Sequence, residues 1–234
     1  MLRKLLFVVF IAAFTFAACG RQVTPDRTTT PSGLPSGFMQ VKFTTAQAMD
    51  FTNVQYVIVF NTSGTGGMPY ANGFLNNYAN YSFAIVVNGA GSFSQVQMVQ
   101  YVRSPSVGGG TLATPQAIPA APQQLQYAPN SSNTQFTVTI DRKLFNGIVP
   151  VSPSPGSNPN IWYANWFTTN TSGVPIDAPG INGPQNTSFT FPISGTPGFD
   201  VTTAFDSQWT FQIGWPQVSP ASAQIAGGEI INSP

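Results

Sequence analysis

Short runs of alternating apolar and polar residues recur along most of the chain, and glycine or proline interrupts them at close intervals. The first run places Met39, Val41 and Phe43 on one side and Gln40 and Lys42 on the other. A period of two residues is typical of a strand with one buried face. The 22 glycines and 21 prolines leave little room for long helices. We therefore predict an all-β protein.

Segments with this pattern are bounded by turn-forming residues. They span residues 38–43, 54–60, 81–87, 93–102, 135–140, 161–168, 187–191 and 209–215. Each strand offers an apolar side that must be buried, and two sheets packed face to face achieve this. In the second segment Val57 and Val59 are also apolar on the other side, which predicts a strand covered on both faces. The expected architecture is a β-sandwich of about eight strands, with which an immunoglobulin-like or fibronectin-like topology is compatible.

The stretch from Ser104 to Ser132 interrupts the strand pattern with three consecutive glycines and several prolines. It is either a long loop within one domain or a linker between two domains of about 70 and 100 residues. Four strands alone have difficulty closing a core. We therefore favour one domain, residues 38–234, with a long loop at 104–132.

The start of the chain has the layout of a signal peptide. Arg3 and Lys4 precede an apolar run, residues 5–16, and two alanines separate this run from Cys19. The run is shorter than the roughly 20 residues that a membrane-spanning helix needs. We therefore expect residues 1–18 to be removed from the mature protein.

The four residues Phe-Ala-Ala-Cys at positions 16–19 resemble the lipobox of bacterial lipoproteins. The resemblance covers residues 1–20 and implies cleavage after Ala18 and lipidation of Cys19. An ordinary secretory signal cut at the same bond would leave a free thiol instead. Gly20 stands where relatives retained at the inner membrane carry aspartate, so the resemblance favours the outer membrane or the cell surface.

Residues 19–37 follow as a lipid-bearing cysteine and a tether rich in proline, threonine, serine and glycine. Such a composition buries too little apolar surface to offset the entropy lost on ordering. Several acyl chains together hold a protein firmly on a bilayer, because each buried methylene contributes about 0.8 kcal/mol. The expected partner is therefore the membrane, reached through the lipid, with the domain held beyond the tether.

The chain contains no histidine, and Cys19 is its only cysteine. Ser-His-Asp and Cys-His catalysis and histidine-ligated metals are thereby excluded, as are intrachain disulfides. Without Arg3 and Lys4, six of the eight basic residues remain against seven acidic ones. Such a balance offers no patch for phosphates. We predict no cofactor and no nucleic-acid partner.

Carboxylates are the remaining candidates for catalysis, since glycoside hydrolysis needs only two of them in one cleft. The candidates are Asp50, Asp141, Asp177, Asp200, Asp206 and Glu229. Asp200 and Asp206 lie six residues apart, and calcium binding by them would need further oxygen ligands such as Asp177. Most of these residues lie where turns are expected, and aspartate is favoured in turns because it bonds nearby backbone N–H groups. We therefore favour structural roles and predict no metal site.

Asp141-Arg142-Lys143 is the densest charge cluster of the mature chain. A lysine can activate a serine nucleophile. The cluster follows an expected strand directly, and charges at such positions protect a sheet edge from pairing with other chains. We favour this second interpretation.

The richest aromatic pattern lies in residues 161–167. In a strand, Trp162 and Trp166 share one face, and Tyr163 lies on the other. Such rings either pack into the core or form a platform on which sugar rings stack, as in sandwich-fold carbohydrate-binding modules. Core packing is favoured because buried aromatics dominate core energetics. Exposure of the rings separates the two interpretations.

These observations predict a non-catalytic, lipid-anchored cell-envelope protein whose β-sandwich acts in binding, adhesion or scaffolding with an unidentified protein or glycan partner. The main alternative is a carbohydrate-binding module that uses Trp162, Trp166 and Tyr163. A carboxylate-based hydrolase is a third possibility, and it requires two acids that converge in one cleft.

Overall fold

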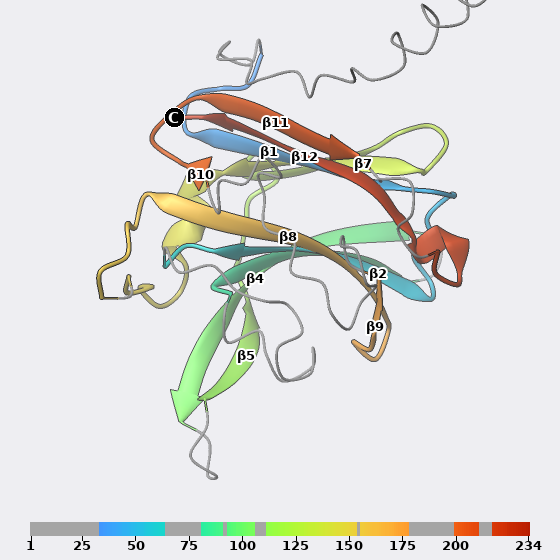
Figure 1. Cartoon of the computed structure of the whole chain (residues 1–234), viewed down its shortest axis with the longest axis horizontal. Coiled ribbons are helices and arrows are strands. Elements are labelled where there is room, and N and C mark those ends of the chain that lie inside the picture. Colours follow the sequence, from blue (N-terminus) through green and yellow to red (C-terminus); the bar gives the residue numbers. More distant parts are fainter. Residues whose placement is uncertain are drawn as a thin grey trace, which may run out of the picture.

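The computed structural model describes residues 33–63, 81–90, 93–105, 111–153, 155–177, 199–210 and 217–234. These residues form twelve strands, β1 to β12, and two short 3-10 helices, η3 and η4. The strands build two antiparallel sheets that face each other (Figure 1). The all-β prediction and the sandwich are confirmed, but the strands exceed the eight that we predicted.

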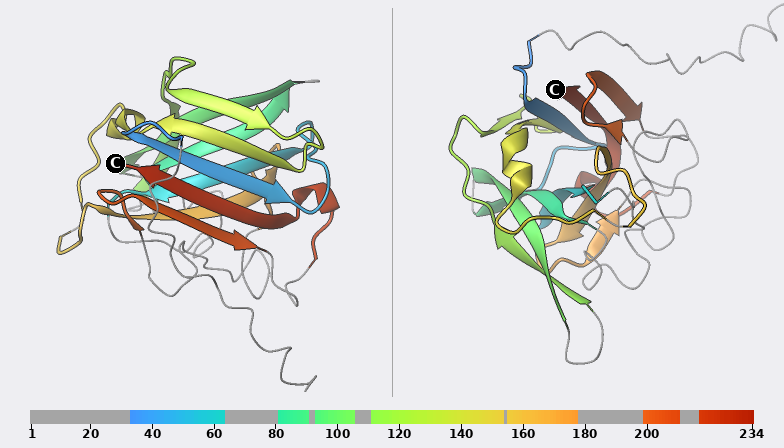
Figure 2. Two further views of the ribbon diagram at one scale, coloured as in Figure 1. Left: turned by 90° about the horizontal axis from the view of Figure 1, so that it is seen from above. Right: turned by 90° about the vertical axis from the view of Figure 1, so that its left-hand side faces the viewer.

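The five-stranded sheet has the order β11-β12-β1-β7-β6. Its strands are β1 (Phe38–Thr45), β6 (Leu125–Pro129), β7 (Gln135–Asp141), β11 (Phe205–Thr210) and β12 (Ile225–Ser233). In Figure 2, seen from above, blue β1 lies between red β12 and yellow β7. The first strand of an immunoglobulin sandwich lies at a sheet edge. Among the described strands the first, β1, lies in the middle of its sheet, so their order differs from that topology.

The seven-stranded sheet has the order β10-β8-β2-β3-β4-β5, and β9 pairs with β8 as well. Its strands are β2 (Val54–Asn61), β3 (Phe83–Ala90), β4 (Phe93–Pro105), β5 (Thr111–Ala117), β8 (Ile161–Asn170), β9 (Pro175–Asp177) and β10 (Phe199–Asp200). On β2, the inward Ile58 and Phe60 and the outward Val57 and Val59 are all buried. This confirms that β2 is covered on both faces.

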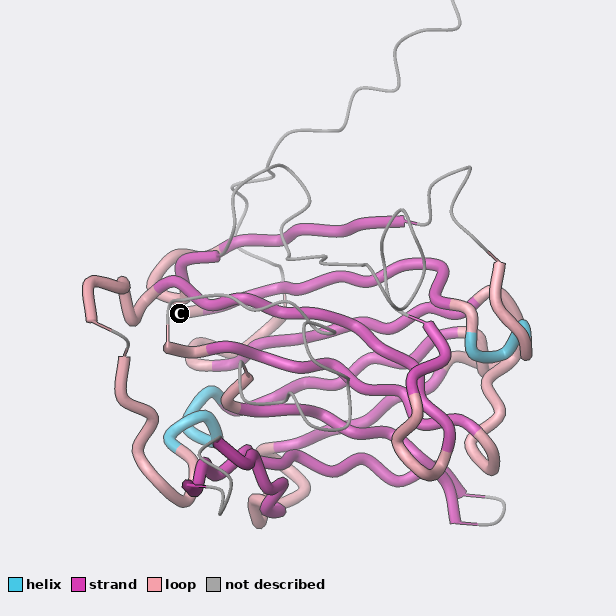
Figure 3. Tube along the Cα trace, turned by 60° about the horizontal axis from the view of Figure 1, so that its bottom comes forward, coloured by secondary structure: helices cyan, strands magenta, loops and turns pink. Residues whose placement is uncertain are grey.

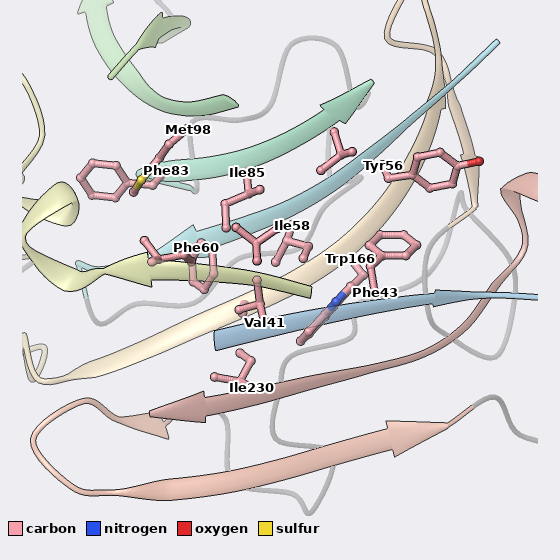
Figure 4. Close-up of a cluster of buried hydrophobic side chains, with 14 of the residues drawn as sticks. Val41, Phe43, Tyr56, Ile58, Phe60, Phe83, Ile85, Met98, Trp166 and Ile230 are labelled. Carbon is pink, nitrogen blue, oxygen red and sulfur yellow. The ribbon is translucent and has the colours of Figure 1, made fainter. Parts of the chain in front are cut away.

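The core lies between the sheets and draws side chains from both (Figure 4). The ring of Phe43 on β1 stacks on Phe136 of β7 with centroids 5.3 Å apart, and it meets Tyr56 of β2 edge-on at 5.5 Å. Strands before and after residues 104–132 contribute to this one cluster.

The prediction of a long loop at residues 104–132 is wrong. The segment contains the end of β4 and all of β5 and β6, and only residues 118–124 cross from one sheet to the other. Beyond Tyr101, β4 pairs with β5 alone, and the two strands project from the body as an arm (Figure 1). The sequence did not predict these strands because Pro115 lies in β5 and Pro129 lies in β6, and a proline argues against a strand.

Both prolines fit because β5 and β6 are edge strands. Ile118 N donates to Met98 O across β4 and β5 at 2.9 Å, and Asn130 N donates to Gln135 O across β6 and β7 at 2.8 Å. Antiparallel pairs alternate between bonded and non-bonded positions, so Pro115 and Pro129 both direct their nitrogens away from the sheet. Each proline removes a donor from an open edge and hinders pairing with another chain.

Residues 36–37, just before β1, and residues 233–234, at the end of β12, lie together at one end of the sandwich, which we call the tether end. Gly37 N donates to Ser233 O at 2.8 Å, and Ser36 Oγ donates to Pro234 O at 2.6 Å. Helix η3 (Arg142–Asn146) lies at this end, whereas η4 (Ala221–Ala223) lies at the other (Figure 3). Ser36 and Gly37, predicted to belong to the tether, are thus bonded to the domain.

Some predictions concern residues outside the described ranges. They are the signal peptide, Cys19, the strand at 187–191 and residues 211–215 of the last predicted strand. Residues 209 and 210 of that strand belong to β11.

Candidate functional site

Trp166 belongs to the core, which corrects the idea that it forms part of a glycan platform. Its side chain is fully buried, and its Nε1 donates to Lys42 O of the opposite sheet at 3.0 Å. The residue bridges the two sheets (Figure 4). A ring without exposed surface cannot stack on a sugar.

Trp162 lies on the same inner face but at the tether end, where it is half-buried. Its ring packs against Phe145 with centroids 4.8 Å apart, and it meets Phe199 at 6.4 Å. Its Nε1 donates to Pro159 O at 3.1 Å. Tyr163 is half-buried on the opposite face of β8, so the three predicted residues do not form one surface.

The candidate carboxylates bond to backbone or partner side chains in separate parts of the sandwich. Asp50 accepts hydrogen bonds from Thr52 N and from Asn53, whose side chain holds the pKa of Asp50 below its usual value. Asp200 accepts from Thr202 N at 2.8 Å. These two residues confirm the turn interpretation.

Asp177 and Glu229 are not turn residues. Asp177 is buried at the end of β9, and its Oδ2 accepts from Ile225 N, at the start of β12, at 2.8 Å. Glu229 lies in the middle of β12 and forms an ion pair with Lys42 of β1. Asp206 is half-exposed on β11. Within the described part of the chain, no three acidic, histidine or cysteine side chains gather as a metal site would require.

The charge cluster at residues 141–143 holds the tether end together. Asp141 caps η3 by accepting from Lys143 N at 3.0 Å. Arg142 N donates to Gly37 O at 2.9 Å, and the Arg142 guanidinium donates to Val201 O. Our prediction that the cluster protects a sheet edge is wrong, because β7 lies between β1 and β6.

After η3 the chain exposes two aliphatic side chains that the sequence analysis did not single out. Ile148 is 50% exposed and Val149 is 44% exposed. The buried side chain of Gln100, on β4, fixes their backbone: its Oε1 accepts from Ile148 N at 2.7 Å and from Val149 N at 3.0 Å, and its Nε2 donates to Val149 O. We call residues 147–149 the clamped loop. The sequence signal for this contact is that Gln100, a polar residue, occupies an inward position of a predicted strand.

Gly147 begins the clamped loop with a φ of +67°, and a Cβ there would lie 2.7 Å from the amide group of Gln100. We therefore expect Gly147→Ala to lower the free energy of unfolding by about 2–3 kcal/mol, through backbone strain together with displacement of the clamp. Urea denaturation followed by circular dichroism measures this loss.

Gly156→Ala is the matched control, because Gly156 has a φ of +77° but open space around its Cβ position. It should lose about 1 kcal/mol from strain alone. Equal losses of stability in the two variants would contradict close packing of Gln100 against the clamped loop.

Comparisons with family models, with curated proteins and with solved structures found no match to this chain. Among the described residues, none of the helices is long and apolar enough to cross a membrane.

Proposed function

We propose that this chain is a lipid-anchored protein of the cell envelope, whose non-catalytic β-sandwich acts in binding, adhesion or scaffolding at a membrane surface. The observation that carries the proposal is the Ala-Ala-Cys sequence ending at Cys19, directly after a short apolar run and before a proline-rich stretch. We favour the outer membrane or the cell surface, because Gly20 follows the cysteine.

The arrangement of the domain agrees with such an anchor. Gly37, where the chain enters the domain, and Pro234 lie at one end, so a tether attached before Gly37 leaves the opposite end and the outer face of the five-stranded sheet accessible to partners. The outer face of the five-stranded sheet is polar, with Gln40 donating to Thr139 at 3.2 Å beside the Lys42–Glu229 ion pair. Such a face is suited to polar contacts with a protein or a glycan.

Metabolic labelling tests the anchor. In a bacterium that makes the protein and is fed an alkyne-bearing fatty acid, we expect the wild type to incorporate the label and Cys19→Ala to incorporate none, because the acyl chains require the cysteine. Phe16→Leu is the matched control, because lipoboxes most often carry leucine three positions before the cysteine, and it should incorporate the label as the wild type does. Label in Cys19→Ala, or none in the wild type, would refute the proposal.

A further inference from the structure

The clamped loop presents apolar side chains to solvent in a fixed conformation. Three hydrogen bonds from the buried Gln100 hold the backbone of Ile148 and Val149, and the positive φ of Gly147 allows the chain to reach that position. Scattered exposed aliphatic residues are ordinary on a protein surface. Here two such residues are consecutive, and the backbone that carries them is fixed by a buried polar side chain, an arrangement suited to contact with an apolar partner.

The loop lies at the tether end. It directly follows η3, whose Arg142 N bonds to Gly37 O at the point where the chain enters the domain. From Cys19 to Gly33 there are 14 peptide units, and a fully extended chain of that length spans at most about 50 Å. A lipid on Cys19 therefore keeps the tether end within about 50 Å of the bilayer, and shorter tether conformations bring it to the surface.

We propose that Ile148 and Val149 insert into the surface of the same bilayer that holds Cys19, so that the tether end of the sandwich faces phospholipid. This inference rests on the lipid anchor proposed above. The apolar pair would enter the boundary between headgroups and acyl chains, as membrane-surface anchors do.

Charges near the loop are compatible with this orientation. Lys143 is exposed on η3, and in this orientation its ammonium group would be available to lipid phosphates. The carboxylates at this end, Asp141 and Asp200, accept hydrogen bonds from the backbone of Lys143 and Thr202. A glycan is a poorer occupant, because aliphatic side chains offer no ring on which a sugar can stack.

Fluorescence quenching by spin-labelled lipids tests the contact. Ile148→Cys is labelled with an environment-sensitive fluorophore in the full protein purified from membranes and reconstituted into vesicles of phosphatidylcholine and phosphatidylglycerol. The matched control is Val174→Cys. Val174 is 46% exposed, and its N donates to Asn170 Oδ1 at 2.8 Å, beyond the far end of β8 and about 30 Å from that strand's start.

We expect lipid quenchers in the acyl region to remove most of the fluorescence at position 148 and to leave that at position 174 unchanged. Equal behaviour of the two positions would overturn the proposal. A signal at position 148 that depends on protein concentration and not on quencher would place a second copy of the chain on the loop, and it would overturn the proposal as well.

The wild type is treated with the same fluorophore as a control. Its labelling separates the failure of the lipid anchor from the failure of the loop contact. A lipidated Cys19 has no free thiol and accepts no fluorophore, whereas a labelled wild type refutes the anchor. In that case Ile148→Cys is placed in a Cys19→Ala background and mixed with preformed vesicles. Quenching then supports the loop contact without the anchor, and its absence refutes the contact.

Discussion

Replacing Trp166 with alanine should lower the free energy of unfolding by about 3–5 kcal/mol, the range expected for removal of a large aromatic side chain from a closed core. Trp166 is fully buried, and its indole bonds to Lys42 O across the two sheets. The variant loses apolar contacts, leaves a cavity and removes a donor. Urea denaturation monitored by circular dichroism gives the loss directly.

Trp162→Ala is the matched control, since Trp162 shares the inner face of β8 but is only half-buried. We expect a smaller loss of stability, because part of that side chain is already in contact with water. The comparison also separates the core interpretation from the glycan platform. Unchanged stability of Trp166→Ala, combined with loss of binding to a glycan, would contradict the structure described above.

Two buried tyrosines should make the protein lose stability steeply above about pH 10. Burial raises the pKa of Tyr56 and of Tyr81 above the ordinary value of about 10. Below pH 10 both phenols are protonated in the folded and unfolded states, and their contribution is constant. Above it the unfolded chain releases protons that the folded protein keeps. Stability then falls by about 1.4 kcal/mol per pH unit for each tyrosine.

Tyr56→Phe tests this expectation. The Tyr56 hydroxyl accepts from Asp50 N at 2.8 Å and donates to Ser222 O at 3.1 Å, so the variant should be about 1 kcal/mol less stable at pH 7. Above about pH 10 the difference should shrink, and it should reverse by about pH 11, because phenylalanine has no proton to release. Denaturation curves collected from pH 7 to pH 12 give the pH at which the wild type and the variant have equal free energies of unfolding. Curves that stay parallel over this range would contradict the assigned burial.

The strands that could be predicted are those whose burial follows a simple alternation. In β1 and β7 every second residue enters the core and the others meet solvent, so sequence and structure share one period. The outward valines of β2 likewise predicted cover on both faces. Such an alternating pattern indicates which residues are buried, and it can be seen in the sequence alone.

The strands that were missed depend on their neighbours. β12 contains Gly227 and Gly228, which weaken a strand pattern, yet it pairs along its length with β1 and β11. β5 and β6 contain prolines that are tolerated only because these strands lie at sheet edges. The error about residues 141–143 has the same cause, because the sequence alone does not show that β7 pairs with β1 on one side and with β6 on the other.

The candidate site was only partly visible in the sequence. Trp162 and residues 141–143 stood out through composition, and the structure places them at the tether end. The exposure of Ile148 and Val149 depends on Gln100, nearly fifty positions earlier in the chain. Contacts between residues that are distant in sequence have no local signature, so only the folded arrangement reveals the clamped loop.

The most direct test of the proposed function is the intact mass of the protein purified from membranes of a bacterium that expresses it. We predict a mass that corresponds to a chain beginning at Cys19 and carrying acyl groups. A chain that begins at Cys19 without acyl groups, or one that retains residues 1–18, would contradict the lipid anchor. The protein would then be a β-sandwich whose attachment to the envelope has to be sought elsewhere.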